Sequence, residues 1–139
     1  MDPEYFLDTN IVLYAAAGER HEPRKAPRAL ELIGRGPFGT SGQVLAEFFF
    51  NATERVKVPL PPLLAFEWVH RLSLQPCVAV DTALVKRGIA ISQRFKISYW
   101  DGAIIAAAEA LGAETLYTED LSHGQIYGSV RAENPFHDL

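Results

Sequence analysis

Cysteine is nearly absent from this chain of 139 residues, in which Cys77 is the only residue of its type. One cysteine cannot form an internal disulfide, which excludes a small secreted scaffold held together by disulfide bonds. No histidine and cysteine residues stand at the spacing of zinc ligands either. Because Cys77 lies in the apolar run 76–80, we predict that it packs in a buried strand and has no chemical role.

Long hydrophobic runs are also missing. No apolar segment reaches the ~18 residues that are needed to span a bilayer, and no charged-then-apolar leader is present. We therefore expect a cytoplasmic protein that does not associate with membranes. Hydrophobic residues make up 48% and charged residues 22% of the chain, which is typical of folded, soluble proteins. The length predicts a single domain over residues 1–139.

Neither sign of charge is in large excess. The formal net charge of −4 argues against indiscriminate electrostatic binding of nucleic acid, although it allows a local patch or an acidic metal site. The densest basic stretch is 20–28, which contains Arg20, Arg24, Lys25 and Arg28. Two interpretations of it stay open: a solvated start of a helix, or a rim that contacts phosphate groups.

The chain does contain a regular alternation of strand-like and helix-like segments. Apolar spacing and capping residues predict helices from Ile11 onward, around 29–33, over 42–55, 63–72 and 83–95, and between Ser98 and Gly112. Strand-like segments are expected at 5–7, 37–41, 77–80 and 114–117, with a short edge strand at 129–132. This alternation predicts an α/β fold with a mainly parallel sheet.

The chain is organised around Asp8, which stands between the aromatic strand 5–7 and the apolar helix that follows. In an open α/β sheet, ligands bind beyond the carboxyl ends of the strands, so an acid at this junction is placed to reach them. The alternative is that Asp8 only caps the helix, a position where aspartate is favoured. Asp81 occupies a similar junction, and there a helix cap is the better interpretation.

Three further acids stand at positions from which they could approach Asp8. Glu47 lies beside the apolar stripe of its predicted helix, where a plain surface acid would fit as well. Asp101 falls in the first turn of an alanine-rich helix, where the helix dipole favours its ionised form. Ser98, three residues earlier, matches a capping box with Asp101, which would explain the start of the helix without any catalytic role. Asp120 follows the strand 114–117, with Glu119 directly beside it.

Four converging carboxylates would repel one another and raise their own pKa values unless a divalent cation lay among them. A site made of oxygen ligands selects Mg²⁺ or Mn²⁺ over zinc. Such an ion can activate water and stabilise the charge that develops on a phosphodiester during in-line displacement. The acids Asp8, Glu47, Asp101 and Asp120 therefore suggest phosphodiester hydrolysis.

The four segments that carry these acids resemble the acidic motifs of PIN domains. They are Phe6-Leu7-Asp8-Thr9-Asn10, the stretch 41–47 that ends in Glu47, the stretch 99–108 that contains Tyr99-Trp100-Asp101-Gly102-Ala103, and 116–121. Their order and spacing are most similar to the bacterial VapC-type toxins of toxin–antitoxin pairs. The resemblance covers nearly the whole chain.

This resemblance implies a three-layer α/β/α sandwich and an endoribonuclease that depends on Mg²⁺ or Mn²⁺. It implies that Asp8, Asp101 and Asp120 are metal ligands and that Glu47 completes the acidic pocket directly or through water. Thr9, Asn10 and Thr118 would support these acids. The resemblance also implies an RNA substrate, a homodimer and a small antitoxin partner whose tail covers the site.

Two other functions remain open at this point. The chain could be a non-catalytic module that keeps the fold to bind RNA or protein, and such a module would not need a metal in this pocket. It could also be an aspartyl-phosphate phosphatase, since Asp8 ends a strand. That chemistry usually requires a second acid two residues later, where this chain has Asn10.

Overall fold

The computed structural model of the protein describes residues 2–139. The helices in this part of the chain are α1 (Thr9–His21), α2 (Ala26–Gly34), α3 (Gly42–Glu54), α4 (Pro62–Leu72), α5 (Thr82–Phe95) and α6 (Tyr99–Ala110). The strands are β1 (Tyr5–Leu7), β2 (Thr40–Ser41), β3 (Cys77–Val78), β4 (Thr115–Tyr117), β5 (Ile126–Tyr127) and β6 (Val130–Glu133). The predicted segments recur as observed elements, with bounds shifted by a few residues.

A four-stranded sheet with the order β1-β4-β6-β5 forms the centre of the fold. Strand β1 runs parallel to β4, with Phe6 opposite Leu116, and β4 runs parallel to β6. Only β5 is antiparallel within this sheet. The parallel pair β2-β3 lies next to β1, to which a bridge between Phe6 and Gly39 connects it.

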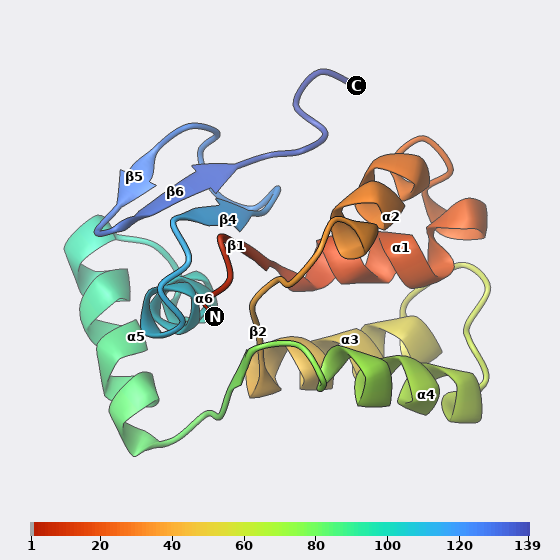
Figure 1. Cartoon of the computed structure of the whole chain (residues 1–139), viewed down its shortest axis with the longest axis horizontal. Helices are drawn as coiled ribbons and strands as arrows, with labels where there is room; N and C mark the ends of the chain where they lie inside the picture. Colours follow the sequence, from red (N-terminus) through yellow and green to blue (C-terminus); the bar gives the residue numbers. More distant parts are fainter. Residues whose placement is uncertain (1) are drawn as a thin grey trace.

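The helices form two groups around this sheet, α1 to α4 on one side and α5 with α6 on the other (Figure 1). Strand β1 is buried along its whole length because both groups cover it. Its residues Phe6 and Leu7 join Ile11 of α1 and Leu116 of β4 in one hydrophobic core. The expected three-layer α/β/α fold with a mainly parallel sheet is thus confirmed.

Helices α5 and α6 cross at very close range. Gly102 of α6 lies so near Gly88 of α5 that a Cβ atom on Gly102 would be 2.5 Å from the Gly88 carbonyl oxygen. The small residues of α6 therefore allow two backbones to touch, as the alanine-rich sequence suggests. This contact fixes the first turn of α6, and with it Asp101.

Two expectations about strands are wrong. Cys77 is exposed rather than buried, because β3 ends at Val78 and has β2 as its only partner, away from the main core. The segment expected as an edge strand, 129–132, belongs to β6, which is paired on both sides. The edge is β5, a two-residue strand too short to show a periodic pattern. Among residues 2–139, no helix has the length and apolar character needed to cross a membrane.

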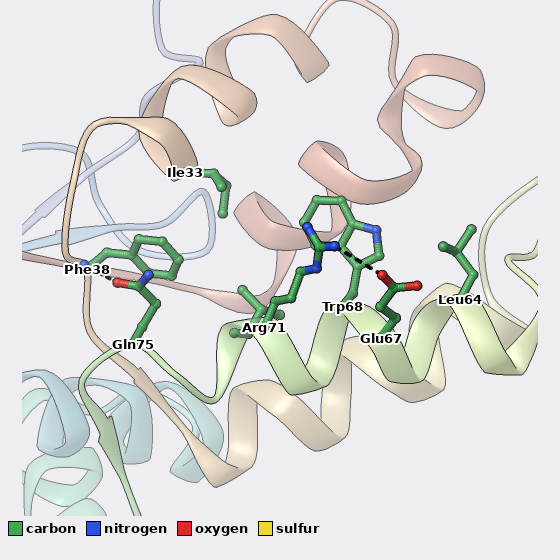
Figure 2. Close-up of a pocket in the computed structure, with 8 residues that line it drawn as sticks. Ile33, Phe38, Leu64, Glu67, Trp68, Arg71 and Gln75 are labelled. Atoms are coloured by element: carbon green, nitrogen blue, oxygen red, sulfur yellow. Dashed lines mark hydrogen bonds and ion pairs between the residues drawn. The ribbon is translucent and has the colours of Figure 1, made fainter.

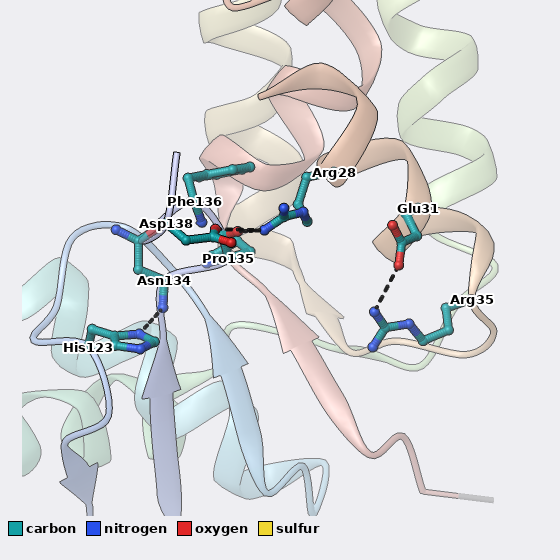
Figure 3. A network of polar contacts seen from close by, with 8 residues as sticks. All are labelled: Arg28, Glu31, Arg35, His123, Asn134, Pro135, Phe136 and Asp138. Carbon is teal, nitrogen blue, oxygen red and sulfur yellow. Dashed lines mark hydrogen bonds and ion pairs between the residues drawn. The ribbon is translucent and has the colours of Figure 1, made fainter. Parts of the chain in front are cut away.

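The basic stretch 20–28 is partly neutralised within the chain. Arg28 bonds through Nη1 to the carbonyl oxygen of Pro135 at 2.6 Å and to Asp138 at 3.1 Å, as Figure 3 shows. Lys25 forms an ion pair of 2.9 Å with Glu119. Both side chains therefore connect the start of α2 to the C-terminal part of the chain, which favours neither of the two interpretations weighed from the sequence alone.

Candidate active site

All four acids selected from the sequence line one small pocket. The pocket has a volume of about 190 Å³ and lies beyond the carboxyl ends of β1 and β4. The residues around it are Asp8, Thr9, Asn10, Gln43, Glu47, Asn51, Trp100, Asp101, Ile104 and Asp120. Residues that are more than 100 positions apart in the chain thus share one cavity.

Asp8 forms the floor of this pocket and is only 6% exposed. Its Oδ1 accepts a hydrogen bond from the backbone N–H of Thr9, and its Oδ2 accepts one from the Thr118 hydroxyl, both at 2.7 Å. Asp8 is therefore a helix cap and a pocket residue at once, so the two interpretations of it do not exclude each other. The expected support by Thr118 is present.

Burial is the largest cause that raises the pKa of Asp8, and with the nearby carboxylates of Asp120 and Glu47 acting in the same direction the pKa reaches about 7. The hydrogen bonds from Thr118 and Thr9 favour the charged form but do not offset the burial. A carboxyl group in this state is only partly ionised at neutral pH.

Glu47 reaches the pocket from α3. Its Oε1 accepts a hydrogen bond of 2.9 Å from the hydroxyl of Thr9, which ties α3 to the first turn of α1. Gln43 and Asn51 lie one turn before and one turn after Glu47, and both line the same cavity. Gln43 was not predicted from the sequence, although its spacing of four residues from Glu47 was the available signal.

Asp101 comes from the first turn of α6, where the Ser98 side chain accepts a hydrogen bond of 3.1 Å from its backbone N–H. The capping pattern read from the sequence is present, and it leaves the carboxylate of Asp101 free to line the pocket. Burial raises the pKa of this carboxyl group, while the contact with Ser98 opposes the shift. Trp100 and Ile104, which the sequence analysis did not select, flank Asp101.

The neighbours Glu119 and Asp120 differ in their surroundings. Asp120 lines the acid pocket, and its pKa is raised by burial and then by the charges of Asp101, Glu119 and Glu47. The Glu119 carboxylate instead accepts hydrogen bonds from Tyr14, from Asn10 at 3.3 Å and from Lys25 at 2.9 Å. The acid that can serve the pocket is therefore Asp120.

The donor set of the pocket fits a hard divalent cation. Its carboxylates and amide oxygens are the ligands that Mg²⁺ and Mn²⁺ prefer, and neither histidine nor cysteine lines it. Within residues 2–139, no three side chains of histidine, cysteine, aspartate or glutamate stand close enough together to hold a metal ion on their own. An ion here would keep several water ligands, as Mg²⁺ usually does. The raised pKa values of Asp8, Asp101 and Asp120 are the physical sign that positive charge would stabilise this pocket.

A second cavity, of about 360 Å³, differs in character (Figure 2). It lies along α4 and is lined mainly by apolar and aromatic side chains, among them Trp68 and Phe38. Its one acid, Glu67, is paired with Arg71 at 3.1 Å. This cavity lacks converging free carboxylates, so the acid pocket is the better candidate for chemistry.

Comparison with known proteins gives a family match. The model of the PIN domain family matches residues 5–128, a span that contains all four pocket acids. No curated protein matches the chain.

The chain is similar in fold to solved structures that include a toxin, a toxin–antitoxin complex and VapBC2. A toxin–antitoxin complex from Klebsiella pneumoniae aligns with a TM-score of 0.68 and 19% identity, covering 94% of this chain and 97% of that one. VapC20 of Mycobacterium tuberculosis, described as a sarcin-ricin loop cleaving toxin, aligns with a TM-score of 0.65 and 18% identity over 84% and 89% of the two chains. VapBC2 of Rickettsia felis, bound to promoter DNA, aligns with a TM-score of 0.63 and 22% identity over 94% and 97%.

Proposed function

The chain belongs to the PIN domain family, and we propose that it is a metal-dependent endoribonuclease that acts as the toxin of a toxin–antitoxin pair. The observation that carries this proposal is the convergence of Asp8, Glu47, Asp101 and Asp120 on one pocket. Carboxylates that raise one another's pKa values are costly to bring together, so an arrangement of this kind is typical of a site that binds cations.

In this proposal, Asp8, Asp101 and Asp120 would hold Mg²⁺ or Mn²⁺ together with water ligands, and Glu47 would complete the pocket directly or through a water molecule. A cation bound there would supply the positive charge that activates water and stabilises the charge developing on the phosphate oxygens. Asp8 is oriented by Thr9 and Thr118, and Glu47 by Thr9. These hydrogen bonds keep the carboxylates in place before substrate arrives, which reduces the reorganisation required during the reaction.

Glu47 is the acid placed to orient the attacking water. It comes from α3, is less buried than Asp8 and is not one of the three acids assigned to the metal. Its carboxylate can accept a proton from water, whereas Asp8 is enclosed by its two hydrogen bonds.

The proposed partners are an RNA substrate, a cognate antitoxin protein and a second copy of the chain. The antitoxin is supported by structures of the same fold from Klebsiella pneumoniae and Rickettsia felis, whose descriptions name a toxin–antitoxin complex and VapBC2. RNA as substrate is supported by the description of VapC20 as a toxin that cleaves the sarcin-ricin loop. We further propose that residues 1–139 act as one PIN-like domain, because a single core extends from β1 to Phe136.

The test is Mn²⁺-dependent cleavage of RNA by the purified chain and by its Asp101→Asn variant. We expect cleavage by the unchanged chain, none without divalent cations, and a loss of at least about a hundredfold in the variant, because one charge of the site is removed. Asp81→Asn is the matched control, since Asp81 caps α5 through a bond of 2.9 Å from Leu84 N–H and does not line the pocket.

Undiminished cleavage by Asp101→Asn would refute the assignment of the site. Calorimetric titration with Mn²⁺ separates the nuclease from a non-catalytic binding module. If the protein were such a module, the heat of Mn²⁺ binding would be the same with and without the Asp101→Asn substitution. That result would favour the binding module over the nuclease.

A further inference from the structure

Trp100 lies at the rim of the acid pocket with 62% of its surface exposed. It immediately precedes Asp101 in the chain. An exposed indole group beside the acid pocket offers a flat apolar face to a ligand that enters this pocket. Trp100 is the one aromatic residue among those that line the acid pocket.

Trp100 also lines a second depression. It has a volume of about 410 Å³ and is lined by Gly42, Gln43, Ala46, Glu47, Val80, Tyr99 and Trp100. Gln43, Glu47 and Trp100 line this depression and the acid pocket alike. The two cavities are therefore adjoining compartments of one surface that share these three residues.

Trp100 makes two contacts, one through its backbone and one through its ring. Gln43 Nε2 donates a hydrogen bond of 3.3 Å to the carbonyl oxygen of Trp100, which ties the first turn of α6 to α3. The rings of Tyr99 and Trp100 meet edge to face, with centroids 5.0 Å apart and planes at 73°. An aromatic ring that already packs against a neighbouring ring loses less conformational entropy when a flat ligand stacks on it.

We propose that Trp100 and the adjoining depression bind an unpaired base of the RNA substrate, next to the phosphate that enters the acid pocket. This inference rests on the proposed nuclease function and names the form of its substrate: single-stranded RNA with a base free to turn outward. Every base has a flat π face that can stack on an aromatic side chain, so the contact does not require a particular sequence.

The chemistry of the depression favours a base over a phosphate. Its walls are mostly apolar, and its one acid, Glu47, would repel a phosphate group. An uncharged base meets no such repulsion. The shared lining residues place this base beside the acid pocket, so one nucleotide chain can occupy both compartments.

The binding experiment uses the whole 139-residue chain with Asp8→Asn, a substitution that prevents hydrolysis and removes one charge. The probes are single-stranded RNA of random sequence, about 12 nucleotides long, and an abasic ribose-phosphate oligomer of the same length and charge. We expect Trp100→Ala to weaken binding of the RNA by roughly 5- to 150-fold, the range for loss of one base–aromatic stack. Binding of the abasic oligomer should change less than twofold, and Trp100→Phe should retain most of the affinity for RNA.

Phe66→Ala is the matched control, because Phe66 is 60% exposed on α4 and lines neither compartment. It should bind both probes like the parent protein. In the protein with Asp8 intact, Trp100→Ala should raise the KM for RNA cleavage and leave kcat within about twofold, because the stack contributes to substrate binding.

Equal affinity of the Trp100→Ala variant and its parent for RNA would overturn the inference. So would an equal loss for RNA and abasic oligomer, or a shift from dimer to monomer in sedimentation, which would show that a second copy of the chain covers Trp100. If the unchanged chain cleaves RNA while any of these results is found, the nuclease function stands and the stacking role alone fails. Absence of both cleavage and RNA binding in the parent proteins would refute the two together.

Discussion

Lys25 and Glu119 form an ion pair of 2.9 Å between residues 94 positions apart. The ammonium group of Lys25 also lies 5.0 Å from the ring centre of Tyr14, whose hydroxyl bonds to the same Glu119 carboxylate. This cluster links the α1–α2 connection to the residue directly before Asp120. Glu119 is thereby occupied within the protein, while Asp120 remains available to the acid pocket.

Replacing Glu119 or Asp120 by the corresponding amide would distinguish the roles of these two residues. We expect Asp120→Asn to weaken Mn²⁺ binding by at least about tenfold, because a charged ligand of the site is lost. Glu119→Gln should leave Mn²⁺ affinity within about threefold and instead lower the free energy of unfolding by roughly 1–3 kcal/mol, since the partner of Lys25 loses its charge. Calorimetry and urea unfolding measure the two effects. The reverse pattern would place Glu119 at the metal.

Replacing Asp8 by asparagine should stabilise the metal-free protein at neutral pH. The folded-state pKa of Asp8, about 7, is above the value near 3.8 of an unperturbed aspartate. The folded protein therefore holds a proton that the unfolded chain has already lost, and its free energy of unfolding falls as the pH rises from about 4 to about 7.

In Asp8→Asn this loss is absent, so the variant should gain a few kcal/mol at pH 7, on the scale of about 1.4 kcal/mol for each unit of pKa. At pH 4 and below the gain should vanish. Thermal unfolding in EDTA at both pH values checks the prediction, and a variant less stable than the unchanged chain at pH 7 would contradict it.

Metal affinity should depend on pH for the same reason. A cation at the pocket competes with the proton on Asp8, so the apparent affinity for Mn²⁺ should fall by up to about tenfold for each pH unit below 7 and level off above it. The raised pKa values of Asp101 and Asp120 act in the same direction. Calorimetric titrations at pH 5.5, 7 and 8.5 would show this trend. Affinity that does not change over this range would mean that Asp8 takes no part in binding.

Gly102→Ala tests the helix contact that positions Asp101. The added Cβ would lie 2.5 Å from the carbonyl oxygen of Gly88 and 2.9 Å from the backbone nitrogen of Ser92, so α5 and α6 must move apart. We expect destabilisation by roughly 1–3 kcal/mol together with weaker Mn²⁺ binding. Gly34→Ala is the control, because nothing lies within 4 Å of its added Cβ, and its stability should not decrease. Equal stability of the two variants would show that the helices adapt to the added methyl group.

The longer helices could be predicted from the sequence because the residue patterns that define them are local. The apolar spacing in 42–55 and 83–95, and the caps at Ser98 and Asp81, depend on residues within a few positions of each other, and the helices formed as predicted. The predictions that failed concern the shortest strands. The exposure of Cys77 and the pairing of β6 on both sides depend on which strands become neighbours. Strands β3 and β5 have only two residues each, so their local sequence does not determine their partners.

By itself, the sequence determined that acids stand at the ends of strand-like segments and in first turns of helices, because local propensity and capping decide where those elements begin and end. Only the tertiary structure decided which acids meet. The Thr118 hydroxyl donates a hydrogen bond to Asp8, 110 positions away in the chain. Glu119 forms an ion pair with Lys25, whereas Asp120 lines the pocket. Such choices depend on contacts between distant segments and on the burial they create, and neither exists until the sheet has assembled.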